Sequence, residues 1–353
     1  DGFPRTIPQA EVLDKALTEI SVVTDKTRSD VMKLTDTFIE LSAKTGMAID
    51  DIAQASTIFY QQGLDDAAVK KMTEWTALFA KISNETVPKA ADQLTAAING
   101  FGYSADQVGE VVDKMSVLAA YSAADINELA TAMSKGASAA AQAGLSFDQY
   151  NAYLATMIET TREAPENIGT SLKTIMARFQ QVKEAGTSED GETDVNKVET
   201  ALKSVGIQLR DSQNQLRDLG DVLEELGPKW NSLDRNTQAY LGTVIAGTRQ
   251  QSRFISLMQN WDRAMELTEA SENSSGAAAR MHAKAMDSLD ASINRLINTW
   301  QKLISNIANG DSFKWLVDIG NKLLSFFATG NSFLRVVTAA IVLFNAKTLM
   351  TNV

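Results

Sequence analysis

The sequence predicts an all-α protein: an array of medium-length helices folded back on one another, then a long heptad-patterned helix and an apolar C-terminal helical segment. Three observations predict this class. Apolar residues recur at helical spacing along most of the 353 residues. Only five prolines occur, so little interrupts helix formation. A short pattern typical of helix starts occurs four times between Leu64 and Tyr150.

In each copy of this pattern an apolar residue precedes a Ser or Asp, and a second apolar residue follows four positions later. The Ser or Asp is expected to be the N-cap, and the apolar pair a hydrophobic staple. Three copies follow a glycine, the residue that most easily takes the left-handed conformation that ends a helix. The four predicted N-caps are Asp65, Ser104, Ser122 and Ser146, and the three glycines are Gly63, Gly102 and Gly144.

Residues 1–183 are predicted to form an N-terminal helical module. In its second helix Val31, Leu34, Phe38 and Leu41 share one face, and Gly46 ends that helix. The predicted helices of the module cover 10–25, 31–45, 49–62, 66–82, 88–99, 108–118 and 123–143, with two more between 146 and 183.

An alanine run in the helix predicted at 123–143 is the largest change of composition along the chain. Small side chains let helices approach closely, and alanine has the highest helix propensity. We interpret it as a tightly packed core helix; a membrane-associating or self-associating helix is the alternative.

Residues 184–194 are rich in Gly, Ser, Thr and acidic residues, and no apolar residue follows Ala185 in this stretch. This composition predicts a flexible loop and an internal boundary. A second helical module is expected at 195–270, with helices at 195–205, 218–226, 236–245 and 251–267. Residues 271–276 then break the chain.

The stretch 277–309 repeats apolar residues at spacings of three and four over about four heptads, which predicts a long helix of coiled-coil type. Packing of this helix on its own domain remains an equal alternative to oligomeric pairing. The expected self-association face consists of Met286, Leu289, Ile293, Leu296, Trp300, Leu303 and Ile307. The one histidine, His282, lies on the same face and is expected to pack there rather than bind a ligand.

Residues 311–353 form the most apolar part of the chain and are the candidate membrane-active segment. Asp318 and Lys322 interrupt the first half. Residues 330–350 match the roughly 20 residues that span a bilayer, but they include one Arg and one Lys.

Composition excludes several kinds of chemistry. A formal net charge of -11 without a basic cluster disfavours specific nucleic-acid binding. The absence of Cys and the single His leave no ordinary zinc site and no base for a serine nucleophile. The acidic pairs Glu224-Glu225 and Asp50-Asp51 are interpreted as solvating a helix or its first turn. We therefore expect no catalytic residue, no cofactor and no metal.

With these helix boundaries in view, the chain closely resembles phage tail tape measure proteins of the TP901 type, in the version common in phages and prophages of Gram-positive bacteria. The resemblance covers roughly 17–303, and its strength comes from the order and number of short matches. The matching stretches are 101–104, 125–130, 143–146, 168–175, 205–207, 216–218, 229–230, 245–247 and 253–261.

The resemblance implies a structural protein that sets tail length, scaffolds assembly of the tail tube on the tail tip and is ejected to help DNA cross the host envelope. Implied partners are the chain itself, as a trimer or hexamer, tail tube and tail tip proteins, and the host inner membrane. DNA would be adjacent in the tail without specific binding. The chain would be part of the virion, in the tail lumen and tip, after assembly in the bacterial cytoplasm.

Two further hypotheses stay open. The apolar segment 311–353 allows a helical pore-forming or toxin-like protein that inserts into membranes. Abundant carboxylates allow a helical glycosidase acting on peptidoglycan. The chain begins at Asp1 rather than Met, which favours a fragment or a processed product.

Overall fold

The computed structural model describes residues 6–180 and 197–286, and every regular element in these ranges is a helix. The one β-type pairing within them is an isolated bridge between Arg210 and Leu216. The predicted all-α class is confirmed. The chain divides into two compact units, Asp1–Asp65 with Lys284–Val353 and Asp66–Ala283.

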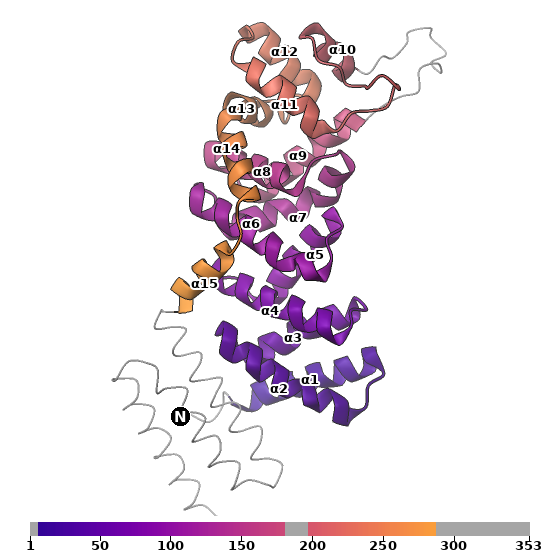
Figure 1. The fold of residues 1–353 in the computed structure, drawn as a ribbon, viewed down its shortest axis with the longest axis vertical. Coiled ribbons are helices and arrows are strands. Elements are labelled where there is room, and N and C mark those ends of the chain that lie inside the picture. Colours follow the sequence, from indigo (N-terminus) through magenta and orange to yellow (C-terminus); the bar gives the residue numbers. More distant parts are fainter. Residues whose placement is uncertain (1–5, 181–196, 287–353) are drawn as a thin grey trace, which may run out of the picture. The chain divides into compact units, whose positions relative to one another are not determined.

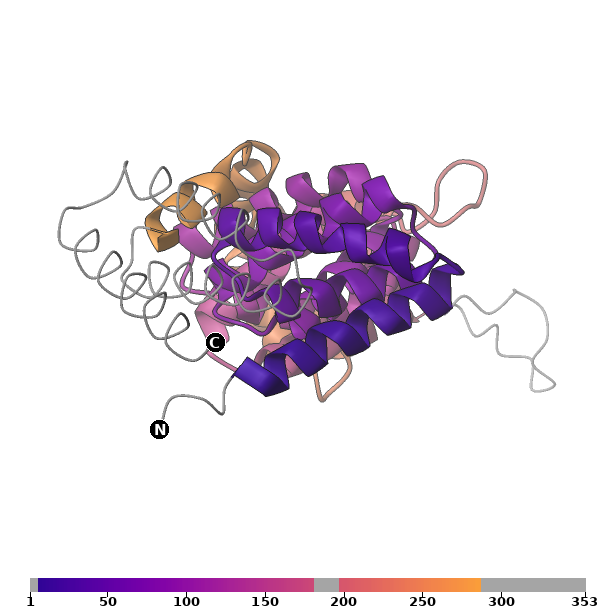
Figure 2. The same ribbon diagram turned by 90° about the horizontal axis from the view of Figure 1, so that it is seen from below.

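The first unit contains helices α1 (Thr6–Thr24), α2 (Arg28–Thr45) and α3 (Ile49–Gln61). The three pack on one another, and Figure 2 views these indigo helices from below. Val31, Phe38 and Leu41 from the predicted face of α2 are buried, while Leu34 is partly exposed. Gly46 ends α2 in the left-handed conformation, as predicted.

The second unit begins with three successive helical hairpins. They are α4 (Asp66–Ser83) with α5 (Val87–Phe101), α6 (Val108–Tyr121) with α7 (Ile126–Gln142), and α8 (Phe147–Thr161) with α9 (Pro165–Gln180). In Figure 1, α5, α7 and α9 follow one another beside α4, α6 and α8. We call α4, α6 and α8 the first layer and α5, α7 and α9 the second layer.

The hairpins recur at intervals of roughly 40 residues, a spacing typical of helical repeat proteins. Gly102 and Gly144 stand at the joints between hairpins, with φ of 70° and 78°, and Gly63 has a φ of 80°. These values lie in the left-handed region that the sequence predicted for all three glycines.

Small residues bring the helices of the second layer together. A Cβ added to Gly169 in α9 would lie 2.2 Å from the carbonyl oxygen of Ala132 in α7. A Cβ added to Gly100 in α5 would lie 2.5 Å from the Cβ of Ala137, also in α7. Ala132, Ala137 and Ala140 are buried. The interpretation of the alanine-rich helix as a tightly packed core helix is confirmed.

The described residues 197–286 contain six further helices: α10 (Lys197–Ser204), α11 (Leu219–Trp230), α12 (Arg235–Ala246), α13 (Gln251–Gln259), α14 (Trp261–Glu272) and α15 (Ala277–Met286). The loop predicted at 184–194 lies outside the described residues. Helices before and after it pack together, with α12 against α9, α13 against α8, and α14 against α6 and α8.

The sequence predicted one helix over 251–267, and this was wrong. The helix breaks at Asn260, whose φ of -109° and ψ of 32° are not helical. Trp261 then starts α14, and its ring lies so close to Gly227 that no Cβ would fit between them. The break lets this aromatic ring reach the backbone of α11.

α15 begins at Ala277, and its described part ends at Met286. Of the seven heptad positions, Met286 alone falls within the described residues. Leu289, Ile293, Leu296, Trp300, Leu303 and Ile307, and the apolar segment 311–353, lie outside them.

Candidate functional site

Ser146 caps α8. Its hydroxyl accepts a hydrogen bond from the backbone amide of Gln149 at 3.0 Å. The side-chain oxygen of Gln149 accepts one from the backbone amide of Ser146 at 2.9 Å. This reciprocal arrangement is a capping box. Leu145 and Tyr150, the expected staple pair, are both buried.

The other predicted caps differ in detail. Ser104 begins a single 3₁₀ turn, Ala105–Gln107, which leads into α6, and its amide donates to Gln107 Oε1 at 3.1 Å. α4 begins at Asp66, so Asp65 directly precedes it.

Ser122 is not an N-cap, which corrects the sequence analysis. It ends α6, where its hydroxyl donates to the Leu118 carbonyl at 2.7 Å. Asp125 caps α7 instead, accepting from the Glu128 amide at 2.7 Å while Glu128 accepts from the Asp125 amide at 2.9 Å. Two capping patterns overlap in the sequence here, and the one with a long acidic side chain at the third helical position forms the box.

A set of polar contacts, here called the polar seam, joins the first layer to α14 and the start of α15. Its members are Asp113, Lys114, Asp148, Glu159, Arg263 and Ser271, together with the amides of Gly276 and Ala278. Each pair links positions far apart in the sequence, so the seam holds α14 and the start of α15 against the first layer.

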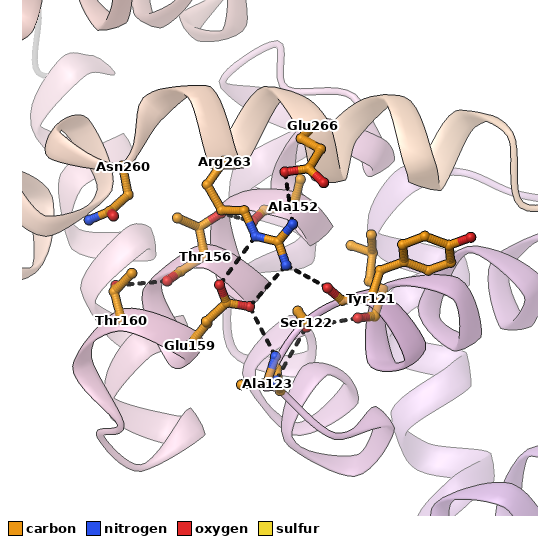
Figure 3. Close-up of polar contacts among 12 residues, drawn as sticks. Tyr121, Ser122, Ala123, Ala152, Thr156, Glu159, Thr160, Asn260, Arg263 and Glu266 are labelled. Atoms are coloured by element: carbon orange, nitrogen blue, oxygen red, sulfur yellow. Dashed lines mark hydrogen bonds and ion pairs between the residues drawn. The ribbon is translucent and has the colours of Figure 1, made fainter.

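At one end of the seam, Arg263 of α14 meets Glu159 of α8 (Figure 3), with 3.2 Å between Nε and Oε1. Arg263 also donates to the Tyr121 carbonyl, and Glu159 accepts from the Ala123 amide at 2.9 Å. One ion pair thereby ties α8 and α14 to the joint between α6 and α7. Glu266 pairs with the same guanidinium at 2.8 Å.

The Glu159 carboxyl is shifted toward its charged form. Burial acts to raise its pKa, but the hydrogen bonds from Arg263 and the Ala123 amide and the positive charges nearby outweigh burial. Its pKa therefore lies below the ordinary value.

In the middle of the seam, the Lys114 ammonium lies 2.7 Å and 2.6 Å from the two oxygens of Asp148. Both side chains are largely buried, at 8% and 13% exposure. The buried hydroxyl of Ser271 donates to Asp148 Oδ1 at 2.6 Å, bringing α14 into the pair. Buried charges persist where they are paired and hydrogen-bonded in this way.

At the far end, the Asp113 carboxylate of α6 accepts from the amides of Gly276 and Ala278 at 2.7 Å and 2.8 Å. The first amides of a helix have no partner within the helix. Gly276, which precedes α15, has no side chain to cap it. Asp113 therefore caps α15 from a distant part of the chain.

The acidic pairs Glu224-Glu225 and Asp50-Asp51 lie in helices, and Glu224 and Glu225 contact other side chains. Glu224 accepts from the Gln149 side chain at 2.7 Å, and Glu225 pairs with Arg217 at 2.6 Å. Asp50 and Asp51 lie in the first turn of α3 as expected, but burial, aided by Asp50, raises the pKa of Asp51 to about 6.

Within the described ranges, no three His, Asp or Glu side chains gather in a way that could hold a metal ion. His282 lies in α15 and is partly exposed. Among residues 6–180 and 197–286, no helix combines the length and apolarity needed to cross a bilayer. What the described chain offers is a set of packed helices and the contacts that hold them.

Sequence reasoning missed the seam. Its pairs join residues between 34 and 165 positions apart, and each of its charged residues alone resembles an ordinary helix-surface charge. The spacing rules that reveal caps and heptads act within one helix and carry no signal for such pairs.

The described residues form an all-helical fold, and comparison with known proteins gives the family of the chain. Residues 35–247, more than half of the chain, match the model of the family described as phage-related minor tail protein. The chain belongs to this family.

Two curated relatives are similar to the chain. One is the tape measure protein of Pneumococcus phage Dp-1, 20% identical over 79% of this chain and 23% of the relative. Another is the probable tape measure protein of Escherichia phage P2, 24% identical over 71% of this chain and 27% of the relative. The chain thus spans about a quarter of the length of each. No solved structure matches it significantly.

Proposed function

We propose that the chain is a segment of a tape measure protein, which sets tail length, scaffolds the tail tube on the tail tip and is ejected to help DNA cross the host envelope. The observation that carries the proposal is similarity over most of this chain to two proteins bearing that name. Family membership supports a structural role in the tail. We assign the chain no catalytic role.

The fold suggests which part of this task the segment performs. As one continuous helix, the chain would measure roughly 500 Å at about 1.5 Å per residue. Helices α4–α9 instead pack as hairpins and cover far less length. We infer that this is a folded segment of the ruler and that the extended, length-setting part lies elsewhere in the protein.

The partners we propose are tail tube and tail tip proteins and further copies of the chain, as a trimer or hexamer. The heptad face from Met286 to Ile307 would mediate self-association. The host inner membrane is the partner proposed for 311–353, and DNA would lie nearby without specific contacts. The chain would reside in the tail lumen and tip of the virion.

Loss of the protein tests the assembly role. In the phage that encodes the chain, a stop codon in its gene should abolish tails or leave them without a uniform length in electron micrographs. Supplying the intact gene in trans should restore uniform tails. Uniform, full-length tails assembled without the protein would contradict the proposal.

Light scattering tests self-association. The purified chain should exceed the monomer mass, and a variant with Leu296→Asp and Leu303→Asp should not. A chain that is monomeric at every concentration would remove the heptad from the proposal.

A further inference from the structure

Residues 261–283, comprising α14 and the part of α15 within the second unit, are held to the first layer in two different ways along their length. Near the start, the Arg263–Glu159 ion pair is accompanied by apolar contact: Trp261, Ala264 and Leu267 are buried, and the Trp261 and Tyr153 rings lie 5.4 Å apart. Figure 1 shows this segment in orange.

Toward the other end, the buried residues become small. Ser271, Ser274, Ala277 and Ala278 are buried, but together they offer few apolar atoms. The specific contacts here are polar ones, from Ser271 to Asp148 and from the amides of Gly276 and Ala278 to Asp113. Apolar attachment therefore declines along the segment as attachment through two carboxylates takes over.

We propose that residues 261–283, here called the strap, open from their C-terminal end as a separate unit while α4–α9 stay folded. Asp113 and Asp148 are the latches that hold this end closed. Segments with few buried apolar contacts open locally at a lower free energy than the rest of a fold.

The two latches differ in what else they hold. Asp148 is also the partner of the buried Lys114, so changing it disturbs the first layer itself. Asp113 holds the amides of Gly276 and Ala278, and these are its contacts with the strap. Because Gly276 cannot cap α15, loss of the Asp113 carboxylate leaves those two amides without an acceptor. Asp113 is therefore the residue that controls opening with the least effect elsewhere.

Opening would release residues 271–283 from α6 and α8 without unfolding the hairpins. The strap packs mainly on α6 and α8 of the first layer, whereas the helices of the second layer are joined by the close packing at Gly100 and Gly169. Protection of α7 therefore reports whether the hairpins remain folded while the strap opens. This inference stands on intramolecular contacts and does not depend on the proposed function.

Hydrogen exchange of the full chain, followed by mass spectrometry at rising urea concentration, tests the strap. Peptides from 271–283 should lose protection at lower urea than peptides from α7, with those from 261–268 between them. Loss of protection in all three at the same urea concentration would overturn the proposal.

An Asp113→Ala variant tests the latch, with Asp106→Ala as the matched control. Asp106 lies just before α6, and its side chain is 83% exposed. Asp113→Ala should speed exchange of residues 276–283 by about tenfold, the effect of losing hydrogen bonds to a charged acceptor, with α7 unchanged. The control should change neither. Unchanged exchange at 276–283, or equally faster exchange in α7, would overturn the role of Asp113.

Discussion

The second layer and the polar seam join helices of the same unit by opposite means. In the second layer, Gly169 and Gly100 bring backbones so close that no side chain fits between them. In the seam, carboxylates of the first layer accept hydrogen bonds from Arg263 and Ser271 of α14 and from amides at the start of α15. Close packing depends on size and is intolerant of added atoms, whereas paired charges depend on pH and on both partners being present.

Removing the cation at the middle of the seam should have the largest effect. In Lys114→Met, Asp148 remains buried without its ammonium partner, so the free energy of unfolding should fall by about 3–5 kcal/mol. Urea unfolding followed by circular dichroism measures this. Lys71→Met, which breaks an exposed pair with Asp106, should cost about 1 kcal/mol or less. Equal losses of stability in the two variants would show that the buried Lys114–Asp148 pair stabilises the fold no more than the exposed Lys71–Asp106 pair.

Replacing a glycine of the second layer by a larger residue should also lower the free energy of unfolding. Gly169→Val places atoms against the backbone of Ala132, and overpacking of this kind costs about 1–3 kcal/mol. Thr170→Val changes the exposed neighbouring residue and should alter the urea midpoint little. If Gly169→Val left the midpoint within error of the wild type, α7 and α9 would not be in close contact.

The Arg263–Glu159 pair should make part of the stability depend on pH. The folded pKa of Glu159 is lowered, so its contribution is present above the unfolded value of about 4.3 and is lost as pH falls through the folded pKa. Arg263→Ala should therefore cost about 1.5–3 kcal/mol near pH 7 and distinctly less below pH 4. Urea unfolding at several pH values measures this. A loss that is independent of pH would mean that Arg263 acts through packing alone.

The caps should give the smallest effects. Ser146→Ala removes the hydroxyl that accepts from Gln149 and should cost about 1 kcal/mol. Ser122→Ala, at the end of α6, should change the free energy of unfolding by no more than about 0.5 kcal/mol. Thermal unfolding of the two variants compares them. A larger loss at Ser122 than at Ser146 would reverse the assignment of the caps.

The sequence predicted those parts of the fold that depend on neighbouring residues. The Ser146 cap, the glycine joints and the alanine-rich core helix all follow from spacing within one or two turns. The start of α7 was misplaced because Ser122 and Asp125 both fit a cap, and the side-chain bond to Glu128 decides between them. The break at Asn260 depends on the fit of Trp261 against Gly227, which no local pattern encodes.

The seam lay beyond sequence reasoning for the same reason. Asp113 and Ala278 are brought together because α14 packs on α6 and α8, and Asp113 does not differ in type from the charged residues on other helix surfaces. Close packing leaves a compositional trace in the run of alanines, whereas isolated charges leave none.

Mass spectrometry of purified tails tests most directly the claim that this folded segment belongs to the tail. Peptides from the hairpins between Asp66 and Gln180 should be found in tails separated from free protein. Their absence from tails, while the protein is present in the same lysate, would contradict the account.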